Sequence, residues 1–327
     1  MLVSIVAPCH NEEAVIELFY RELCAVLDSI QGYAFELVLV DDGSRDTTLD
    51  KINSLAMKDE RIRFISFSRN FGKESAVYAG LSYAQGDIVT VMDADLQDPP
   101  ALLPQMLGYI DEGYDSVATC RVTRTGEPII RSFFARQFYK LIKRISNVDM
   151  VDGARDYRMM TRQVVEAILS MQEYHRFSKG IFGWVGFKTY WIPYENIERV
   201  AGETSWSFWK LFAYAIDGII AFTIMPLRVA SFSGILFSVL AFIYLIYIVI
   251  KTFVLGIDVP GYASTIAVVL FMGGIQLVSV GVLGEYMART YLEVKQRPAY
   301  IIKDHNLPEY SIPGLSPNNS TNLSKRP

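Results

Sequence analysis

Two long uncharged runs in the last third of the chain constrain its fold more than any other feature. No Asp, Glu, Lys or Arg occurs over residues 229–250 or over residues 259–284. At about 1.5 Å of rise per helical residue, either run is long enough to cross the ~30 Å hydrocarbon core of a bilayer. The connection between them contains Gly256, Pro260 and Gly261, which favour a tight turn. These features predict a hairpin of two transmembrane helices; the alternative is a helical hairpin buried in a soluble protein.

The charges around the hairpin predict its orientation. The connection carries Asp258, with Lys251 at its edge. The basic residues that flank the hairpin are Arg228, Arg289, Lys295 and Arg297. Because basic flanks stay on the cytoplasmic side, we expect both ends of the hairpin in the cytoplasm. The N-terminus has no basic and apolar leader, which agrees with this expectation.

The predicted hairpin divides the chain into a water-soluble part and a membrane part. The chain has 327 residues and is 51% hydrophobic, and the apolar excess lies after about residue 206. The stretch that follows is apolar but contains Lys210 and Asp217, which favours an interfacial helix over a third span. We expect a cytoplasmic domain over residues 1–205, an interfacial amphipathic helix over 206–227, transmembrane helices at about 229–251 and 262–286 within 228–288, and a cytoplasmic tail over 289–327, disordered from about 307.

Charge and cysteine content exclude some partners and compartments. The formal net charge of −4 gives no reason to expect nucleic acid as a partner. The cysteines, Cys9, Cys24 and Cys120, are far apart and form no CxxC pair. They fit small core residues in a reducing compartment.

The first part of the chain alternates between strand and helix patterns. The apolar, β-branched runs that predict strands are residues 2–7, 35–40, 62–67, 87–92 and 116–120. Helical spacing of apolar residues lies between successive strands. This alternation predicts an α/β domain with a Rossmann-like parallel sheet covered by helices. Ligands bind beyond the carboxyl ends of such strands, where Asp41, Asp42, Asp93 and Asp95 are expected.

The motif DADLQDPP at residues 93–100 is the strongest chemical signal. It follows the fourth predicted strand directly, and its first and third residues are Asp93 and Asp95. Two carboxylates at this spacing can bind a divalent cation, and oxygen ligands suit Mg²⁺ or Mn²⁺ bridged to a diphosphate. The alternative is a polar loop with a helix cap before Pro99.

The motif VLVDDGSRD at residues 38–46 follows the second predicted strand. A carboxylate of Asp41 or Asp42 could accept the N–H of a nucleobase. The alternative is a helix-capping turn in which Ser44 or Asp46 caps the next helix.

The end of the first strand carries a third motif, APCHNEE at residues 7–13. Its backbone and Glu12 could hold a base and a ribose. The neighbouring His10 is expected to be a loop residue, because no second His or Cys lies at zinc-ligand spacing.

Residues 128–147 combine basic, aromatic and aliphatic side chains at helical spacing. The basic members of this segment are Arg131, Arg136, Lys140, Lys143 and Arg144. A helix of this kind can lie on a membrane surface, and its cations would attract anionic headgroups. The alternative is an ordinary solvated face of a domain helix.

Taken together, these motifs resemble those of the family 2 glycosyltransferases, which have the GT-A fold. The resemblance rests on PxxNEE, VDDGSxD, the turn at residues 70–73 and DADLQDPP, in this order. Three further motifs narrow it to the polyprenyl-phosphate sugar transferases, such as dolichyl-phosphate mannose synthase and the bacterial bactoprenol glucosyltransferases. These motifs are GARDYRMM at residues 153–160, AGETSW at 201–206 and the ending GEY…EVKQRP at 284–298. The match runs from about Val3 to Ile302.

The resemblance implies roles for individual residues. Nucleotide-sugar binding would fall to Pro8, Glu12, Asp41, Asp42, Lys73, Asp93, Arg121 and Arg131. The metal ion, Mg²⁺ or Mn²⁺, would be held by Asp93, Asp95 and Gln97. The catalytic positions would be Asp95 and Asp156, and the lipid phosphate would meet Arg131, Arg136, Arg155 and Arg158. Arg155 and Arg158 could equally be structural ion-pair partners. Many relatives carry Lys just before the aromatic residue at 206, where this chain has Ser205, which puts one phosphate contact in doubt.

The implied activity is inverting sugar transfer at the cytoplasmic face of a plasma membrane. A hexose or N-acetylhexosamine would move from a UDP-sugar, with a GDP-sugar still open, to undecaprenyl or another polyprenyl phosphate for cell-envelope glycans. A phosphate monoester is largely ionised at neutral pH, so Asp156 could act as a base, which we favour, or as a positioning group. The hairpin could also pack against copies of itself.

Three other functions fit parts of the pattern. A processive GT-A polysaccharide synthase shares the core, but the chain has no QxxRW motif and too few predicted spans to line a pore. A non-catalytic scaffold that senses nucleotide-sugars would not need both the DxD motif and Asp156. A dinucleotide-dependent oxidoreductase would carry GxGxxG after the first strand, which is absent.

Overall fold

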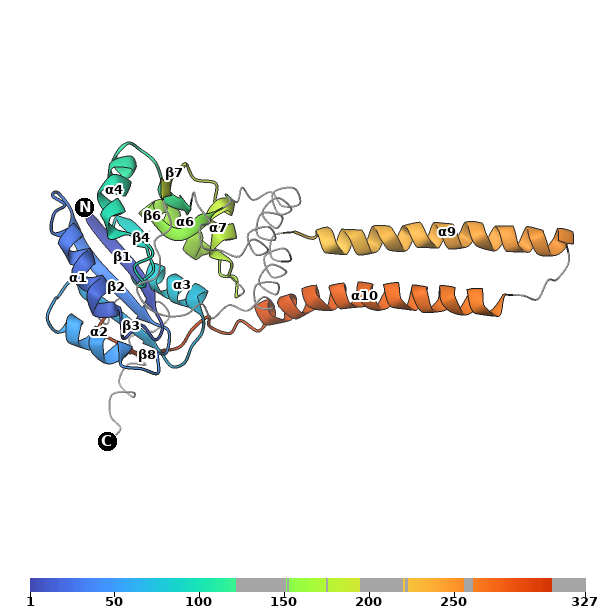
Figure 1. Cartoon of the computed structure of the whole chain (residues 1–327), viewed down its shortest axis with the longest axis horizontal. Helices are drawn as coiled ribbons and strands as arrows, with labels where there is room; N and C mark the ends of the chain where they lie inside the picture. The colour runs from blue at the N-terminus through green and yellow to red at the C-terminus, as the bar shows by residue number, and fades with distance from the viewer. Residues whose placement is uncertain are drawn as a thin grey trace, which may run out of the picture. The chain divides into compact units, whose positions relative to one another are not determined.

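A computed structural model describes residues 1–121, 151, 153–174, 176–194, 220, 223–255 and 261–307 (Figure 1). The chain forms two compact units. The first comprises Met1–Lys143, Val148–Ser207 and Pro298–Pro327, and the second comprises Arg144–Asn147 and Phe208–Arg297. The first unit therefore contains both the start of the chain and a segment that follows the second unit.

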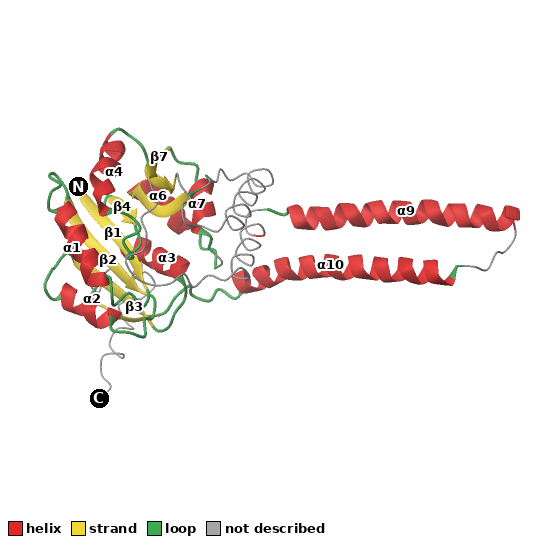
Figure 2. Cartoon of the chain, in the orientation of Figure 1, coloured by secondary structure: helices red, strands yellow, loops and turns green. Residues whose placement is uncertain are grey.

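An eight-stranded sheet forms the centre of the first unit (Figure 2). Its strands are β1 (Leu2–Cys9), β2 (Ala34–Asp41), β3 (Ile62–Phe67), β4 (Ile88–Val91), β5 (Ser116–Arg121), β6 (Ala154–Thr161), β7 (Thr189–Tyr194) and β8 (Ile302–His305). Their order is β7-β5-β6-β4-β1-β2-β3-β8. β1 pairs in parallel with β2 and β4, β2 with β3, and β5 with β7. β6 runs antiparallel to both β4 and β5, and β8 runs antiparallel to β3.

Helices cover both faces of this sheet (Figure 1). They are α1 (Ile16–Leu27), α2 (Thr48–Ala56), α3 (Lys73–Tyr83), the 3₁₀ turn η1 (Pro100–Leu102), α4 (Leu103–Asp111), α6 (Arg162–Ser170) and α7 (Ser178–Trp184). One face packs α1, α2 and α4 around a core that includes Ile5, Phe19 and Leu39, all fully buried. On the other face α3 approaches so closely that a Cβ at Gly80 would lie 2.1 Å from Cγ1 of Val6.

The expected GT-A catalytic fold is confirmed, with one correction to the sheet. The five strands predicted from apolar runs all form, but the sheet is mixed and not purely parallel. The strand β6 lies between β4 and β5 in the opposite direction. Local patterns of strand and helix predict which residues are extended, whereas the neighbour of a strand depends on contacts that are distant in sequence. The alternation therefore could not reveal the inserted reversed strand.

The sequence offered Ser44 or Asp46 as the residue that caps α2, and the structure separates these two alternatives. The Ser44 hydroxyl accepts a hydrogen bond from the backbone N of Asn11 at 2.9 Å, so it ties the first loop to the second. Asp46 is the residue that supports the helix start, because its Oδ1 accepts the backbone N–H of Thr48 at 3.1 Å. The N-cap residue itself is Thr47, whose side chain makes no capping hydrogen bond, so Asp46 supports the helix start from the position before the cap.

The second unit contains two long apolar helices, α9 (Met225–Leu255) and α10 (Tyr262–Val294). Within them, Met225–Ile248 and Ser264–Val294 have mean hydropathies of 2.3 and 2.4 and are long enough to cross a membrane. The helices contact each other through Phe237 and Phe271, whose rings meet edge to face at 5.6 Å. These features agree with the predicted hairpin. The proposed interfacial helix over 206–227, except residues 220 and 223–227, and the amphipathic segment 128–147 lie outside the described residues, as do residues 308–327 of the tail.

A return of the chain onto the sheet edge was not predicted. After α10, Tyr300 stacks on Phe67 with ring centroids 4.9 Å apart, and β8 adds to the edge of β3. Asn306 then extends the pairing with its side chain. Its Oδ1 accepts the backbone N–H of Phe64 at 2.7 Å, and its Nδ2 donates to the carbonyl of Ile62 at 2.9 Å. The strand β3 is therefore covered by a segment more than 230 residues later.

We expect Asn306→Ala to destabilise the first unit by about 1–3 kcal/mol, since each of the two lost side-chain hydrogen bonds contributes about 0.5–1.5 kcal/mol. Thermal unfolding of the full chain in detergent should show a midpoint lowered by roughly 2–10 °C. The matched control is Lys303→Ala, an exposed residue of β8, which should leave the midpoint unchanged. Equal midpoints for both variants would contradict the role given to Asn306.

Candidate active site

The loops that follow β1 and β2 are joined by a set of hydrogen bonds at the carboxyl edge of the sheet. The backbone N of Asp42 donates to the carbonyl of Cys9 at 2.8 Å, and Nδ1 of His10 lies 2.9 Å from the carbonyl of Asp42. The backbone N of Glu12 donates to Oγ1 of Thr48 at 2.8 Å. His10 is thus a loop residue, as expected. The two motifs predicted for nucleotide binding form one surface.

The carboxylates of Asp41 and Asp42 are buried and hold the loops around them. Oδ1 of Asp41 accepts the backbone N–H of Ser44 at 3.1 Å, and its Oδ2 accepts the hydroxyl of Ser66 at 2.7 Å. Oδ1 and Oδ2 of Asp42 accept the backbone N–H groups of Phe71 and Gly72 at 2.6 and 2.9 Å. Burial raises the pKa of Asp42, although these two hydrogen bonds act in the opposite direction. The main visible effect of Asp42 is to fix the turn that precedes Lys73.

The loop of the DADLQDPP motif folds back on itself. Leu96 has φ of +60°, a left-handed conformation that costs a residue with a side chain about 1–2 kcal/mol. Two carboxylates hold this turn: Asp95 accepts the backbone N–H of Gln97 at 3.1 Å, and Asp98 accepts that of Asp93 at 3.0 Å. The turn brings Asp93, Asp95 and Gln97 onto one short loop.

Asp98 is buried and supports this loop. It belongs to the DADLQDPP motif, but the sequence predicted no role for it. It is 1% exposed, and its Oδ1 lies 3.4 Å from Nη2 of Arg155 and 3.5 Å from the hydroxyl of Tyr194. Burial, with the nearby charge of Asp93, raises the pKa of Asp98 to about 7, while Arg155 acts in the opposite direction. Asp98 therefore connects the loop after β4 to strands β6 and β7.

One ammonium group connects the predicted metal loop with the predicted acceptor side. Nζ of Lys73 lies 2.6 Å from Oδ1 of Asp93 and 2.7 Å from Oδ2 of Asp156. Desolvation works against a charged amine here, but the two carboxylates raise the pKa of Lys73 well above its ordinary value. Desolvation likewise opposes the ionised form of Asp156, yet Lys73 and then Lys179 hold the pKa of Asp156 well below its usual range. Lys73 and Asp156 are therefore both charged near neutral pH.

The helix α7 is tied to α3 next to this ion-pair cluster. Oε2 of Glu74 accepts the backbone N–H of Ser178 at 3.1 Å and also the hydroxyl of Ser178. Burial raises the pKa of Glu74. This contact supports the first turn of α7, so that Lys179, the next residue, faces Asp156 closely enough to affect its pKa.

The two arginines of β6 differ in their surroundings. Arg155 pairs with Asp98 and lies 3.4 Å from Oε1 of Gln97, so the ion-pair alternative is confirmed for this residue. Arg158 is 5% exposed, and its guanidinium lies over the rings of Phe182 and Trp191, 4.6 and 5.3 Å from their centroids. Over the part of the chain that the structure describes, no carboxylate lies within ion-pair distance of Arg158.

The donor set of the loop after β4 fits a hard divalent cation. Asp93 and Asp95 supply carboxylates and Gln97 an amide oxygen, which are ligands that Mg²⁺ and Mn²⁺ prefer. Within the described ranges, no three His, Cys, Asp or Glu side chains are grouped so that they could hold a metal by themselves. A Mg²⁺ ion commonly binds one or two carboxylates and takes its remaining ligands from water and substrate phosphates.

The structure thus brings most of the predicted site residues to one edge of the sheet. Pro8 lies at the end of β1 beside Val40, and Asp156 lies on β6. Arg121 ends β5. Arg131 and Arg136 lie outside the described residues. The residues that the sequence analysis gave no role are Glu74, Asp98, Ser178, Lys179 and Trp191; of these, Asp98 alone stood in a recognised motif.

Comparison with known proteins gives two family matches that together cover most of the chain. Residues 4–169 match the model of glycosyl transferase family 2. Residues 225–290 match the GtrB C-terminal hairpin. The second match coincides with α9 and most of α10.

Several curated relatives are similar over nearly their full lengths. A glycosyltransferase of Bacillus subtilis (strain 168), CsbB, is 44% identical over 95% of this chain and 94% of its own. The prophage bactoprenol glucosyl transferase homolog of Escherichia coli (strain K12) is 42% identical over 93% of this chain and 99% of its own. The bactoprenol glucosyl transferase of Shigella phage SfII is also 42% identical, over 93% of this chain and 98% of its own.

We expect Asp98→Ala to weaken metal-dependent binding of a nucleoside diphosphate by about 10–100-fold, because a residue that orients metal ligands typically has an effect of this size. Calorimetric titration of UDP and of GDP, each with Mn²⁺, into the full chain in detergent measures this. Asp111→Ala is the matched control, since Asp111 pairs with Tyr33 on the surface and should leave binding unchanged. Undiminished binding by a folded Asp98→Ala variant would show that the loop holds its shape without this carboxylate.

Proposed function

The chain belongs to glycosyltransferase family 2, and we propose that it transfers a hexose or N-acetylhexosamine from a nucleotide-sugar to a polyprenyl phosphate. The observation that carries the proposal is the similarity, over more than nine-tenths of both chains, to relatives named bactoprenol glucosyl transferases. That similarity includes both the catalytic domain and the apolar hairpin. We propose UDP-sugars as the donors, with GDP-sugars as the alternative, because the apolar hairpin resembles that of the bacterial enzymes. The product would serve cell-envelope glycan modification.

The donor would lie across the carboxyl ends of β1, β2 and β4. Pro8, Glu12, Asp41 and Asp42 would contact the base and ribose, and Arg121 and Arg131 would add positive charge for the phosphates. Asp93, Asp95 and Gln97 would hold Mg²⁺ or Mn²⁺, which when bound stabilises negative charge on the departing diphosphate. Lys73 contacts Asp93, and its ammonium group would be a second cation beside the diphosphate oxygens.

The reaction would be a direct displacement at the anomeric carbon. An oxygen of the lipid phosphate forms a bond to that carbon, while the bond from the carbon to the diphosphate oxygen breaks. The electron pair leaves with the nucleoside diphosphate, and the configuration of the sugar inverts. Because a phosphate monoester has its second pKa near ~6, most of the nucleophile is already ionised at neutral pH.

The sequence favoured Asp156 as a base; we now propose instead that Asp156 positions the reactants. Its pKa is held low by Lys73, and a weak base gives little help to a nucleophile that is already ionised. The contact at 2.7 Å instead lets Asp156 fix the Lys73 ammonium group between donor and acceptor. Arg131, Arg136 and Arg158 are the proposed contacts of the lipid phosphate, while Arg155, predicted as a fourth contact, is paired with Asp98.

The matching hairpin model and the two apolar helices indicate membrane association. We further propose that the hairpin spans the plasma membrane with both ends in the cytoplasm. The support is the excess of Arg and Lys outside the two runs. Membrane lipids would then surround α9 and α10, and the hairpin could pack against copies of itself.

Sugar transfer by the purified full chain in detergent tests the function. Radiolabelled UDP- and GDP-sugars are offered with undecaprenyl phosphate, with and without Mg²⁺ or Mn²⁺. We expect one donor to give a lipid-extractable, metal-dependent product, and Asp95→Ala and Asp156→Ala to lower its rate at least about 100-fold. Asp111→Ala should keep the wild-type rate. No lipid product from any donor, with nucleotide binding intact, would overturn the polyprenyl-phosphate acceptor.

Labelling of single cysteines in intact cells tests the membrane orientation. In a background without Cys9, Cys24 and Cys120, we expect Asp258→Cys to react with a membrane-impermeant maleimide added from outside. Ser320→Cys should react only after the membrane is permeabilised. The opposite labelling pattern would place the catalytic domain outside the cytoplasm.

A further inference from the structure

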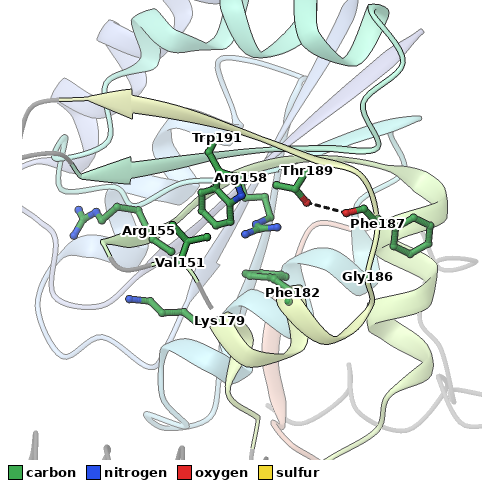
Figure 3. Close-up of a pocket in the computed structure, with 11 residues that line it drawn as sticks. Val151, Arg155, Arg158, Lys179, Phe182, Gly186, Phe187, Thr189 and Trp191 are labelled. Carbon is green, nitrogen blue, oxygen red and sulfur yellow. Dashed lines mark hydrogen bonds between the residues drawn. The ribbon is translucent and has the colours of Figure 1, made fainter. Parts of the chain in front are cut away.

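A basic cavity lies beside Asp156 that the donor site does not use. Its volume is about 350 Å³, and it is enclosed by β6, α7 and β7 (Figure 3). The described residues that line it include three cations, Arg155, Arg158 and Lys179, and no acidic side chain. A concentration of three positive charges without a lining carboxylate favours an anionic occupant.

Arg158 is the most deeply buried of these cations, and one of its N–H donors lacks a partner among the described residues. Its side chain is 5% exposed, and its Nη1 lies 3.3 Å from Oγ of Ser116. Its Nε is buried and has no hydrogen-bond partner among the residues that the structure describes. Figure 3 shows the guanidinium between the rings of Trp191 and Phe182, which keep it in place. The guanidinium is therefore held at the wall of the cavity, where a charged donor can bind an anion.

Lys179 faces the same cavity from α7. The Glu74–Ser178 contact fixes the start of this helix, and Lys179 follows directly. Its charge lowers the pKa of Asp156, so its ammonium group lies near that carboxylate. Among the described residues, no carboxylate forms an ion pair with Lys179, whereas Arg155 pairs with Asp98. Arg158 and Lys179 are therefore the two cations available to a ligand.

The cavity adjoins the reaction site through β6. Asp156 and Arg158 are two residues apart on one strand, so their side chains lie on the same face of the sheet. A second, small cavity is lined by Lys73, Asp156 and Phe182, and Phe182 also lines the basic cavity. An anion held by Arg158 and Lys179 would thus lie next to the Lys73–Asp156 pair.

We propose that this cavity binds the phosphate of the acceptor, with Arg158 and Lys179 as its ligands and with Phe182 and Trp191 beside the first isoprene unit. This inference rests on the proposed function and adds Lys179 and the aromatic pair to it. It also gives Arg155 a supporting role, as the ion-pair partner of Asp98. The volume of about 350 Å³ is more than a phosphate alone needs. The excess room and its aromatic lining fit an apolar chain attached to the phosphate.

Steady-state kinetics of the full chain in detergent, with farnesyl phosphate as a soluble acceptor, test the proposal. We expect Lys179→Ala to raise the KM for farnesyl phosphate about 10-fold or more, because it removes a charge-assisted hydrogen bond to the phosphate. The KM for the donor should stay within about twofold. Lys188→Ala is the matched control, since Lys188 lies on the Tyr114 ring outside the cavity. Arg158→Lys should give a similar rise, and Lys179→Ala decides the result if the buried substitution fails to fold.

Competition by inorganic phosphate separates the headgroup from the chain. We expect inorganic phosphate to compete with farnesyl phosphate, to bind more weakly than it, and to lose potency in Lys179→Ala. An unchanged acceptor KM in Lys179→Ala and Arg158→Lys, or an effect on the donor KM alone, would overturn the proposal. If the wild type transfers no sugar, the proposed function fails, and calorimetric binding of farnesyl phosphate still decides the cavity. Wild-type binding that Lys179→Ala weakens supports it, and equal or absent binding overturns it.

Discussion

The position of one ammonium group, that of Lys73, underlies the arrangement of the whole site. It lies within 2.7 Å of a carboxylate oxygen of Asp93 and of Asp156, two residues that are 63 positions apart in sequence. Two carboxylates that close would repel each other, and the shared cation removes that repulsion. The turn that presents Lys73 is itself fixed by Asp42, whose two oxygens accept backbone N–H groups. A residue of the predicted base-binding motif thus also fixes the turn that presents Lys73.

The reversed direction of β6 brings the residues predicted for the acceptor side next to those predicted for the donor side. In a parallel sheet, functional loops follow the carboxyl ends of the strands. Because β6 runs antiparallel to β4, its first residues, and not its last, lie at that edge. Asp156 and Arg158 consequently lie beside the loop that follows β4. A parallel strand in the same place would have brought Thr161 to this edge.

Parts of the site could be predicted because they are encoded locally. Asp93 and Asp95 are separated by one residue and directly follow an apolar run. A short loop that directly follows a buried strand must lie at the carboxyl edge of the sheet. The same reasoning placed Asp41 and Asp42 at the sheet edge. Asp98 was visible in the same motif, but its role depends on Arg155 and Tyr194, which approach it from β6 and β7. Its function in the fold therefore could not be read from the motif.

The sequence by itself determined the apolar hairpin, the strands and the acidic loops, because hydrophobic length, strand patterns and charge spacing are properties of neighbouring residues. Tertiary structure alone decided the mixed sheet, the return of β8 to β3 and the cavity between β6, α7 and β7. It also decided which of two similar arginines is paired: Arg155 meets a carboxylate, while Arg158 lies between two rings. The physical reason is that these outcomes depend on contacts between segments far apart along the chain, and such contacts leave no periodic or local pattern.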